Sequence, residues 1–409
     1  MNYPESLAWL YGARFSGIKP GLDTTRRLLT ALGSPERQLR FLHVAGTNGK
    51  GSVCALLDSI CRGAGLRTGL YTSPHLCSFR ERILTDGRPI PIEAVVAGVH
   101  RMRQWVEDWD PHPTFFEMTT ALAIEHFAAG GVDLVVLETG MGGRLDATNV
   151  VTPLVSIITR IALDHREWLG SSLTAIAGEK AGIFKPGVPA MTVDQDPDAA
   201  AVLAARAADL GLRLEIVRPP ASPIPCGLAG RHQQLHAELA IRSLDRAGLG
   251  IDRAVCLEGI RSVRWPGRFQ FATERLVLDG AHNPDAAARL ALTWKETFGG
   301  EPATVILAVL RDKDAAGIVR ALAPLTRRWI VTRVANARSL AAGELADLIR
   351  ATAPGAEIFR FDSPGVALDA AMKSEGRILA AGSLFLIGEL LAHLGLAEPD
   401  PPLPVACTH

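Results

Sequence analysis

The chain has 409 residues, 48% of them apolar, and its 43 Lys and Arg balance 43 Asp and Glu to a formal net charge of zero. This length predicts two or three domains with sizeable cores, and a balanced charge without a polybasic run argues against nucleic-acid binding through bulk charge. No apolar run reaches the roughly 18 residues that span a bilayer, and the start MNYPESLAWL lacks the basic and long apolar regions of a signal peptide. We therefore expect a soluble cytoplasmic protein that binds neither nucleic acid nor membrane.

Apolar runs in the first part of the chain alternate with helix-like stretches. The runs at 40–45, 132–138 and 154–159 are predicted strands, and residues 52–63 are a predicted helix. Continuous apolar runs are typical of strands that a parallel sheet buries on both faces. The first part of the chain therefore predicts a series of βαβ units.

A second series of predicted strands begins near residue 276. Its members are LVLDGA from 276, ATVILAV at 303–309, RWIVTRV at 328–334 and RILAAGS at 377–383. The segment VRWPGRFQ at 263–270 lies between the two series, and its Pro-Gly pair breaks regular structure, so we place the domain boundary there. Residues 218–227 carry four prolines and are predicted to form an irregular loop.

The cysteines give no sign of a metal centre or a disulfide framework. There are six of them, and no two have CxxC spacing. This favours reduced, mostly buried thiols over zinc ligands or disulfides. Their positions are 54, 61, 77, 226, 256 and 407.

A glycine-rich loop follows the first predicted strand and leads at once into the predicted helix. Its residues are Gly46, Thr47, Asn48, Gly49, Lys50, Gly51 and Ser52. Glycines let backbone N–H groups turn toward a phosphate, and the helix N-terminus adds partial positive charge. We expect Lys50 to lie exposed in a polar loop and reach the β- and γ-phosphates, with Ser52 near magnesium.

The loop departs from the usual P-loop spacing. Val44 stands where the first glycine would be, and Gly51 separates Lys50 from Ser52. The alternative is a glycine-rich turn that happens to contain a lysine. The order strand, loop, helix disfavours that alternative.

Two further strand ends carry polar side chains. Glu138 ends the run VDLVVLE, and a glycine-rich polar stretch at 139–149 follows it. Asp164 and His165 follow the next predicted strand. Ligands bind at the carboxyl edge of open α/β sheets, and magnesium prefers hard oxygen ligands such as Glu138. The alternatives are a helix cap or solvated acid for Glu138 and a structural or solvated His165.

Lys180 lies on a predicted helix between two Ala-Gly pairs. From these residues alone, a solvated lysine paired with a nearby acid is the favoured interpretation.

In the second series, Asp279 and His282 stand at the carboxyl end of the strand LVLDGA, and Asn283-Pro284 is a predicted helix cap. Arg268, just before this strand, is a candidate phosphate clamp that reaches across an interdomain cleft. The alternatives are a surface charge in the linker for Arg268 and simple capping for Asn283.

Taken in order, these residues resemble the Mur ligase superfamily, and within it the folylpolyglutamate synthase/dihydrofolate synthase branch. Ten blocks in register span nearly the whole chain. The blocks are HVAGTNGKGS (43–52), YTSPHL (71–76), TFFE (114–117), ETGMGGRLDATN (138–149), LDHREWLG (163–170), EKAGIFK (179–185), WPGRFQ (265–270), DGAHNP (279–284), RDKD (311–314) and GSLFLIGE (382–389).

The resemblance implies a role for each matching residue. It implies catalytic roles for Lys50, Lys180 and His282, the last near the phosphates. The implied ATP contacts are Gly46, Thr47, Asn48, Gly49, Lys50, Gly51, Ser52, His236, Arg268 and Asp279. The implied magnesium ligands are Ser52, Ser73, Glu138, His165 and Lys180, the lysine as its carbamate. The implied pterin or folate contacts are Gly21, Leu22, Phe115, Phe116, Glu117, Asp146, Ala147 and Thr148.

A carbamate converts a cation into an anionic oxygen ligand, so the resemblance reverses the surface-lysine interpretation of Lys180. Two positions depart from the family pattern. His236 stands where the family usually has Asn, and Ala308 stands where a glycine is common ahead of the DKD block.

We therefore predict an α/β protein with its site in a cleft between two domains. Residues 1–270 would form an N-terminal P-loop-type Mur ligase ATPase domain, and residues 271–409 a smaller C-terminal Rossmann-like α/β domain. The implied activity is ATP- and Mg²⁺-dependent addition of L-glutamate to a folate through an acyl phosphate, with dihydropteroate as a further acceptor if the enzyme is bifunctional. The expected partners are these small molecules, and a monomer is expected.

Two alternatives stay open. One is a Mur-type ligase for a different carboxylate, and the other is a nucleotide-dependent switch without ligase chemistry. The sequence leaves open whether the enzyme extends folates, acts on dihydropteroate, or does both.

Overall fold

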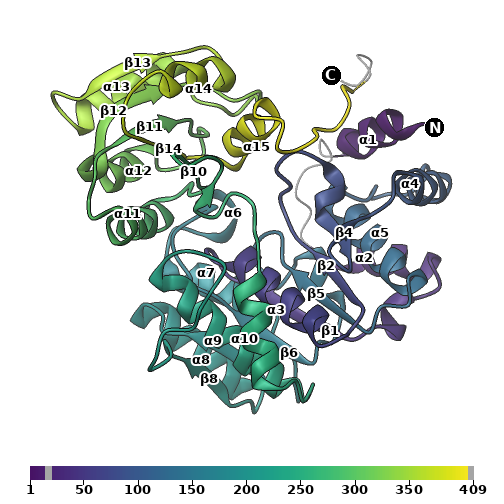
Figure 1. Cartoon of the computed structure of the whole chain (residues 1–409). Helices are drawn as coiled ribbons and strands as arrows, with labels where there is room; N and C mark the ends of the chain where they lie inside the picture. Colours follow the sequence, from purple (N-terminus) through teal and green to yellow (C-terminus); the bar gives the residue numbers. More distant parts are fainter. Residues whose placement is uncertain (14–20, 404–409) are drawn as a thin grey trace.

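Two parallel-type sheets organise the chain (Figure 1), whose computed structural model describes residues 1–13 and 21–403. The first sheet has eight strands in the order β4-β3-β2-β5-β1-β6-β7-β8. The strands are β1 Phe41–Ala45, β2 Thr68–Tyr71, β3 Ile83–Thr85, β4 Arg88–Pro89, β5 Leu134–Glu138, β6 Val155–Ile158, β7 Ala190–Val193 and β8 Leu214–Val217. Only the pairings of β3 with β2 and β4 are antiparallel. The predicted strands at 40–45, 132–138 and 154–159 are confirmed as β1, β5 and β6.

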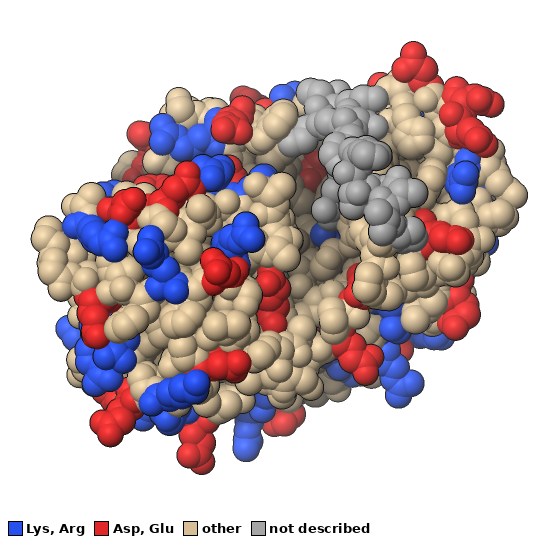
Figure 2. Space-filling view, turned by 90° about the horizontal axis from the view of Figure 1, so that it is seen from above, with Lys and Arg blue, Asp and Glu red and all other residues tan. Residues whose placement is uncertain are grey.

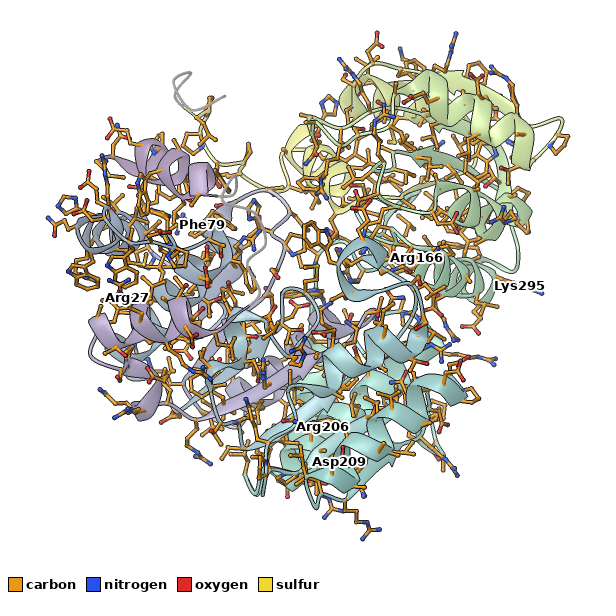
Figure 3. The ribbon with its side chains drawn as sticks, turned by 180° about the vertical axis from the view of Figure 1, so that it is seen from behind. Arg27, Phe79, Arg166, Arg206, Asp209 and Lys295 are labelled. Atoms are coloured by element: carbon orange, nitrogen blue, oxygen red, sulfur yellow. The ribbon has the colours of Figure 1, made fainter. Side chains whose placement is uncertain are left out.

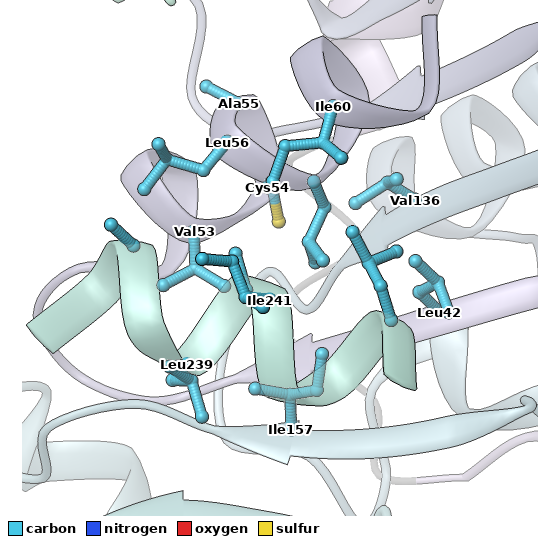
Figure 4. Close-up of a cluster of buried hydrophobic side chains, with 14 of the residues drawn as sticks. Leu42, Val53, Cys54, Ala55, Leu56, Ile60, Val136, Ile157, Leu239 and Ile241 are labelled. Carbon is cyan, nitrogen blue, oxygen red and sulfur yellow. The ribbon is translucent and has the colours of Figure 1, made fainter. Parts of the chain in front are cut away.

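Helices cover both faces of this sheet because its central strands are apolar on both sides. Leu42 and Val44 of β1 face one core, while Phe41 faces the other, as the two-residue period of a strand requires. The first core contains α3 Lys50–Gly63, α9 Arg231–Arg246 and α10 Arg253–Ser262. Figure 4 shows Val53 of α3 and Ile241 of α9 packed in it.

The opposite face is covered by α1 Tyr3–Gly12, α2 Asp23–Ala31, α4 Ile92–Val106 and α5 Phe115–Ala129. A smaller core beside β6 and β7 contains α7 Leu173–Ala181 and α8 Pro197–Asp209. The short elements of this part are η2 Pro35–Gln38, η3 Phe79–Arg82, η4 Ala147–Val150 and α6 Arg166–Leu169. The residues 218–227 form an irregular segment, as predicted.

The second sheet has six strands in the order β13-β12-β11-β14-β10-β9. They are β9 Gln270–Phe271, β10 Leu276–Leu278, β11 Ala303–Leu307, β12 Thr326–Val331, β13 Glu357–Arg360 and β14 Arg377–Ala381, and only β9 runs antiparallel to its neighbour. One face packs on α11 Pro284–Phe298, α12 Ala315–Leu322, η5 Ala323–Leu325 and α13 Ala342–Thr352. The other packs on α14 Pro364–Met372 and α15 Leu384–His393.

The four strands predicted for this part are confirmed as β10, β11, β12 and β14. The second sheet begins at Gln270, and a domain boundary at residue 270 stays our proposal. α6 lies between the two bodies, and the segment after α15 returns from the second body to the first, near α1 (Figure 1).

The five described cysteines are free thiols, with Cys54, Cys61 and Cys256 buried, while Cys407 lies outside the described residues. Among the helices of residues 1–13 and 21–403, none is both long and apolar enough to cross a membrane.

Candidate active site

A cavity of about 1060 Å³ lies where the carboxyl ends of the parallel strands of the two sheets meet. Figure 2 shows a hollow between the two lobes of the molecule. Nearly all residues singled out from the sequence line this cavity. They are Gly21, the seven loop residues 46–52, Ser73, Phe115, Phe116, Glu117, Glu138, Asp146, Ala147, His165, Lys180, His236, Arg268, Asp279 and His282.

Two predicted substrate contacts, Leu22 and Thr148, are not among the lining residues. Leu22 precedes α2 as its N-cap residue. Thr148 is fully buried behind Asp146, and its backbone N–H and hydroxyl both donate to Asp146 Oδ1. Thr148 is therefore held away from the cavity and fixes the orientation of Asp146, which corrects its expected direct contact, while the contact of Leu22, a half-buried neighbour of Gly21, stays a prediction.

The glycine-rich loop fits the form of a phosphate cradle. Gly46 has a φ of +149°, and a Cβ there would lie 1.8 Å from Thr159 Oγ1, so only glycine fits. Gly49, with a φ of +90°, is the N-cap of α3 and offers no side-chain cap. Because the first four N–H groups of a helix have no intrahelical partner, the start of α3 faces the cavity with open donors and a positive dipole end.

Lys50 is the first residue of α3, and its side chain is only 16% exposed. This corrects the expectation that it lies exposed in a loop. Its Nζ donates to Thr47 O at 3.3 Å and lies 4.0 Å from Glu138 Oε1. The ammonium is therefore held at the cavity wall by one hydrogen bond and one ion pair. Its charge helps to keep the neighbouring Glu138 ionised.

Glu138 ends β5 with its side chain buried. Its Oε2 accepts the backbone N–H of Ser73 at 3.0 Å. Burial raises the pKa of Glu138, while Lys50 and the Ser73 hydrogen bond oppose that rise. A buried carboxylate that opens toward a phosphate loop suits a hard cation.

Lys180 is buried, not solvated. Its residue is 3% exposed, and Nζ donates to the Gly46 carbonyl at 2.7 Å. Burial first, and then the charge of Lys50, lower its pKa to about 7. The solvated-lysine interpretation is thus wrong, because the amine lines the cavity and is held in a partly neutral state.

His236 packs directly on the loop. A Cβ at Gly49 would lie 2.4 Å from His236 Nε2, so the ring occupies the space over that glycine. Its Nδ1 pairs with Gln233 Oε1 at 2.9 Å, and burial lowers the pKa of His236 to about 3. The ring is neutral and acts here as a wall of the cradle.

The second body contributes Arg268, Asp279 and His282. Asp279 accepts the N–H groups of Phe269 and Ala281, each at 2.8 Å. Burial raises the pKa of Asp279, and Arg268 opposes that rise. Arg268 is half-buried in the cavity wall and donates to Gly267 O at 3.0 Å, so it is not a solvated linker charge.

A polar network joins the two bodies across the cavity. The side-chain amides of Asn48 and Asn283 pair reciprocally, at 3.1 and 2.9 Å, and Asn48 also donates to Asp285 at 2.9 Å. Asp164 accepts from Lys313 Nζ at 2.6 Å and from Asn283 at 3.2 Å.

His282 Nε2 lies 3.5 Å from the same carboxylate. Burial alone would raise the pKa of Asp164, but the hydrogen bond and charge of His282, with His165 and Lys313 nearby, hold it below its usual value. The network therefore keeps an ionised carboxylate at the junction of the two bodies.

An apolar pocket opens from the same cavity. Phe116 packs on Gly140, where a Cβ would lie 2.4 Å from its ring, and Phe115 stacks on Tyr11 at 5.3 Å. Glu117 lines this part, but its carboxylate accepts the Thr114 N–H at 2.7 Å as the capping box of α5. Asp146 accepts the Met141 N–H at 2.8 Å and is buried. A flat aromatic group with polar edges would suit this pocket.

Arg82 and Trp168 also line the cavity, although neither was predicted as a site residue. Arg82 is 5% exposed, donates to His75 Nδ1 at 2.8 Å and lies 5.2 Å over the Phe115 ring. Trp168 on α6 is 56% exposed at the rim. Only the aromatic residue within the block LDHREWLG hinted at Trp168, and an isolated Arg before a strand carried no signal at all.

Protein atoms in the cavity supply only part of the ligand shell that a magnesium ion needs. Within the described ranges, His, Cys, Asp and Glu side chains form no group of three or more that could hold a metal ion. Magnesium in nucleotide sites usually takes one or two carboxylates and fills its shell with phosphate oxygens and water. Glu138, with the hydroxyls of Ser52 and Ser73 in the same cavity, fits that pattern.

Two protein-family models and many known proteins match this sequence. Residues 44–211 match the Mur ligase middle domain, and residues 267–384 match the Mur ligase glutamate ligase domain. The dihydrofolate synthase/folylpolyglutamate synthase of Bacillus subtilis is 37% identical over 354 residues, which cover 78% of this chain and 82% of that protein.

Solved structures agree. Mycobacterium tuberculosis folylpolyglutamate synthase, complexed with ADP and AMPPCP, is 32% identical with a TM-score of 0.82, covering 93% of this chain and 96% of its own. Escherichia coli FolC, in complex with DHPP and ADP, is 30% identical with a TM-score of 0.86, covering 96% and 98%.

Proposed function

Because the chain belongs to the folylpolyglutamate synthase/dihydrofolate synthase branch of the Mur ligase superfamily, we propose that its cleft joins L-glutamate to a folate at the expense of ATP. The protein is an ATP-dependent ligase that forms an amide bond. One observation carries the assignment of this chemistry to the cleft. A single cavity contains both an uncapped helix N-terminus with Lys50 and an apolar aromatic pocket with Phe115 and Phe116.

The first step is phosphoryl transfer. A carboxylate oxygen of the acceptor attacks the γ-phosphorus of ATP, the bond to the β–γ bridging oxygen breaks, and ADP leaves. Lys50 and the open N–H groups at the start of α3 stabilise the charge on the phosphate oxygens. Arg268 and Asp279 reach the nucleotide from the second body.

The second step forms the amide. The amino nitrogen of glutamate attacks the acyl carbon, phosphate leaves from the tetrahedral intermediate, and the nitrogen loses a proton. The protein contributes mainly position and charge, and closure of the two bodies over the cleft would keep water from the acyl phosphate. His282 lies near the phosphates, beside the ionised Asp164.

We assign the nucleotide contacts to the loop residues Gly46, Thr47, Asn48, Gly49, Lys50, Gly51 and Ser52, together with His236, Arg268 and Asp279. The proposed folate contacts are Gly21, Phe115, Phe116, Glu117, Asp146 and Ala147. The proposal also includes a domain boundary at residue 270 and a cytoplasmic monomer.

Ser52, Ser73, Glu138, His165 and a carbamate on Lys180 would hold magnesium. When bound, the ion would neutralise phosphate charge. The carbamate is supported by the buried, cavity-lining amine, since carbon dioxide reacts only with a neutral amine and the pKa of Lys180 is about 7. A carbamate nitrogen keeps one N–H, so the bond to Gly46 O can persist.

An assay of ADP release tests the proposed function. Purified protein is supplied with ATP and magnesium, with tetrahydrofolate or dihydropteroate, each with and without L-glutamate. We expect ADP release that depends on both acceptor and glutamate, with tetrahydrofolate used and unequal rates for the two acceptors. Release without glutamate or folate would indicate a nucleotide switch, and inactivity with both acceptors would indicate a ligase for another carboxylate.

A further inference from the structure

The segment after α15 forms a strap from the second body to the first. We call residues 394–403 the C-terminal strap. Residues 72–82 are called the folate loop, because their Arg82 lines the cavity over Phe115, one of the proposed folate contacts. The strap crosses to the side of α1 and the folate loop (Figure 1). It is a second connection between the bodies, in addition to the linker at 263–270.

Asp400 is the anchor of the C-terminal strap. Its Oδ1 accepts the hydroxyls of Tyr3 at 2.9 Å and Ser78 at 2.8 Å, and its Oδ2 accepts the Phe79 N–H at 2.7 Å. Its own N–H donates to Cys77 O at 3.2 Å. One carboxylate therefore binds three donors from α1 and the folate loop, and hydrogen bonds to an ionised acceptor are the stronger kind.

The bound end of the folate loop is a stiff turn. Ser78 is the N-cap of η3, and Glu81 accepts the N–H groups of Leu76, Cys77 and Ser78 at 2.7 to 2.9 Å. On its outer side this turn also meets α15. A Cβ at Gly388 would lie 2.2 Å from Leu76 O, so the helix backbone lies directly against the loop.

The other side of the same loop faces the cavity. Ser73 donates its N–H to Glu138, and Arg82, the last residue of η3, lines the cavity over Phe115. Thr72 N–H closes the loop on Arg82 O at 3.0 Å. Asp400 itself does not line the cavity. Any effect it has on the reaction must therefore pass through the residues that it binds, and of these the turn at 77–79 leads through η3 to Arg82 in the cavity wall.

We propose that Asp400 is a positioning residue for folate binding, and that the C-terminal strap holds η3 so that Arg82 meets the acceptor. This inference rests on the proposed function. Since the strap begins in the second body and ends on the folate loop, it also ties the placement of the acceptor to the position of the domain that closes over it.

The experiment compares full-length wild type with Asp400→Ala, Asp400→Asn and a matched control, Asp369→Asn. Asp369 is a carboxylate on α14 of the second body that pairs with His393 of α15 at 3.0 Å and makes no hydrogen bond to the folate loop. Initial rates are measured against tetrahydrofolate at saturating ATP and glutamate, and separately against ATP.

We expect Asp400→Ala to raise the KM for the folate acceptor about tenfold, since a small misplacement of a contact group is costly, while kcat and the KM for ATP stay within about twofold. The acceptor KM of Asp400→Asn should lie between those of wild type and Asp400→Ala, because its amide oxygen still accepts the Phe79 N–H. Asp369→Asn should match wild type. In an Arg82→Ala background, Asp400→Asn should raise the acceptor KM little further.

An unchanged acceptor KM in Asp400→Ala would overturn the proposal. So would parallel losses in acceptor KM, ATP KM and kcat together with a lower melting temperature, which indicate general loosening. If Asp400→Ala does not fold, the double-mutant cycle of Asp400→Asn and Arg82→Ala decides. Effects of the two substitutions on the acceptor KM that add in full would contradict the proposal. A wild type without acceptor-dependent ADP release would instead refute the proposed function.

Discussion

Two helices point their N-termini into the same cleft, and the protein treats them in opposite ways. α3 begins with Gly49, which provides no side-chain cap, so its first N–H groups stay open to a ligand. α11 begins with Asn283, whose Oδ1 accepts the Ala286 N–H at 2.9 Å, and Pro284 removes a further donor.

The difference separates two tasks. The open end of α3 supplies charge stabilisation for an anion. The closed end of α11 joins the bodies, because Asn283 also bonds Asn48 and Asp164 of the first body. Similar strand–turn–helix units at the edges of two sheets thus become the proposed phosphate site in one body and a contact that joins the bodies, the latch, in the other. Five predictions test this division and the buried charges around it.

Lys50→Ala should have the largest effect. It removes the ammonium at the open end of α3 and should lower kcat/KM by about 10²-fold or more, while alanine at the first helical position leaves the fold intact. Lys295→Ala is the control, since Lys295 is exposed at the outer end of α11, away from the cleft (Figure 3). A folded Lys50→Ala protein with near-normal turnover would refute the phosphate role.

Lys180→Arg should come next, with a loss of about 10²-fold that saturating magnesium does not restore. Arginine keeps the charge but forms no carbamate. Lys180→Ala should also lose activity, and a short carboxylate added to the solution should restore part of it by replacing the carbamate oxygens. Wild-type rates for the arginine variant would show that the carbamate is not required.

Substitutions of Asn283 can separate its role as the N-cap of α11 from its role in joining the two bodies. Asn283→Ser keeps a good N-cap but loses the amide pair with Asn48, so we expect near-native stability with an activity loss of about tenfold. Asn283→Ala should lose the same activity and also about 1 kcal/mol of stability. Steady-state rates and thermal unfolding measure the two effects. Equal activity in Asn283→Ser and wild type would refute the latch.

Two buried lysines, one from each body, should respond oppositely to removal of their charge. Lys180 has a carbonyl partner, whereas Lys313 pairs with the buried Asp164 at 2.6 Å. At pH 7, without magnesium or bicarbonate, Lys180→Met should raise the melting temperature by about 2–4 °C, because it removes a poorly compensated buried amine. Lys313→Met should lower the melting temperature, because it takes the lysine partner from the buried Asp164 carboxylate.

The pH dependence has a definite sign. The pKa of Lys180 is about 7 in the folded state against an ordinary 10.5. Between these values the Lys180 amine binds more protons in the unfolded chain, so its contribution to stability rises with pH across that window. The advantage of Lys180→Met should therefore shrink from pH 7 toward pH 10. An advantage that stays constant would contradict the assigned pKa.

Much of the fold was readable from local patterns. The apolar runs that became β1, β5, β6, β10 and β11 were long and continuous, because a parallel sheet buries them on both faces. Seven strands were not predicted, namely β2, β3, β4, β7, β8, β9 and β13. β4 and β13 are exposed strands at the sheet edges, whereas β2 and β7 are buried four-residue strands, and runs this short form strands only because their neighbours pair with them.

The candidate site was predictable where chemistry follows a strand directly. Gly46 to Ser52 and Glu138 fall into this class, since the chain order itself carries a strand end into a turn. Thr148 failed as a cavity residue because adjacency in sequence does not say which neighbour points into a cavity. Lys180 was misjudged from its residues alone, since small apolar neighbours on a helix do not reveal what packs over it.

The sequence by itself determined the two α/β series, the phosphate loop and the acid at the end of β5, because glycine freedom, strand period and carboxylate placement are local properties. Only the tertiary structure decided which charges are buried and which residues meet. Asn48 and Asn283 are 235 positions apart, and Ser78 and Asp400 are 322 apart. No local pattern encodes such pairs, because they follow from how the two sheets dock and from where residues 394–403 meet the first body.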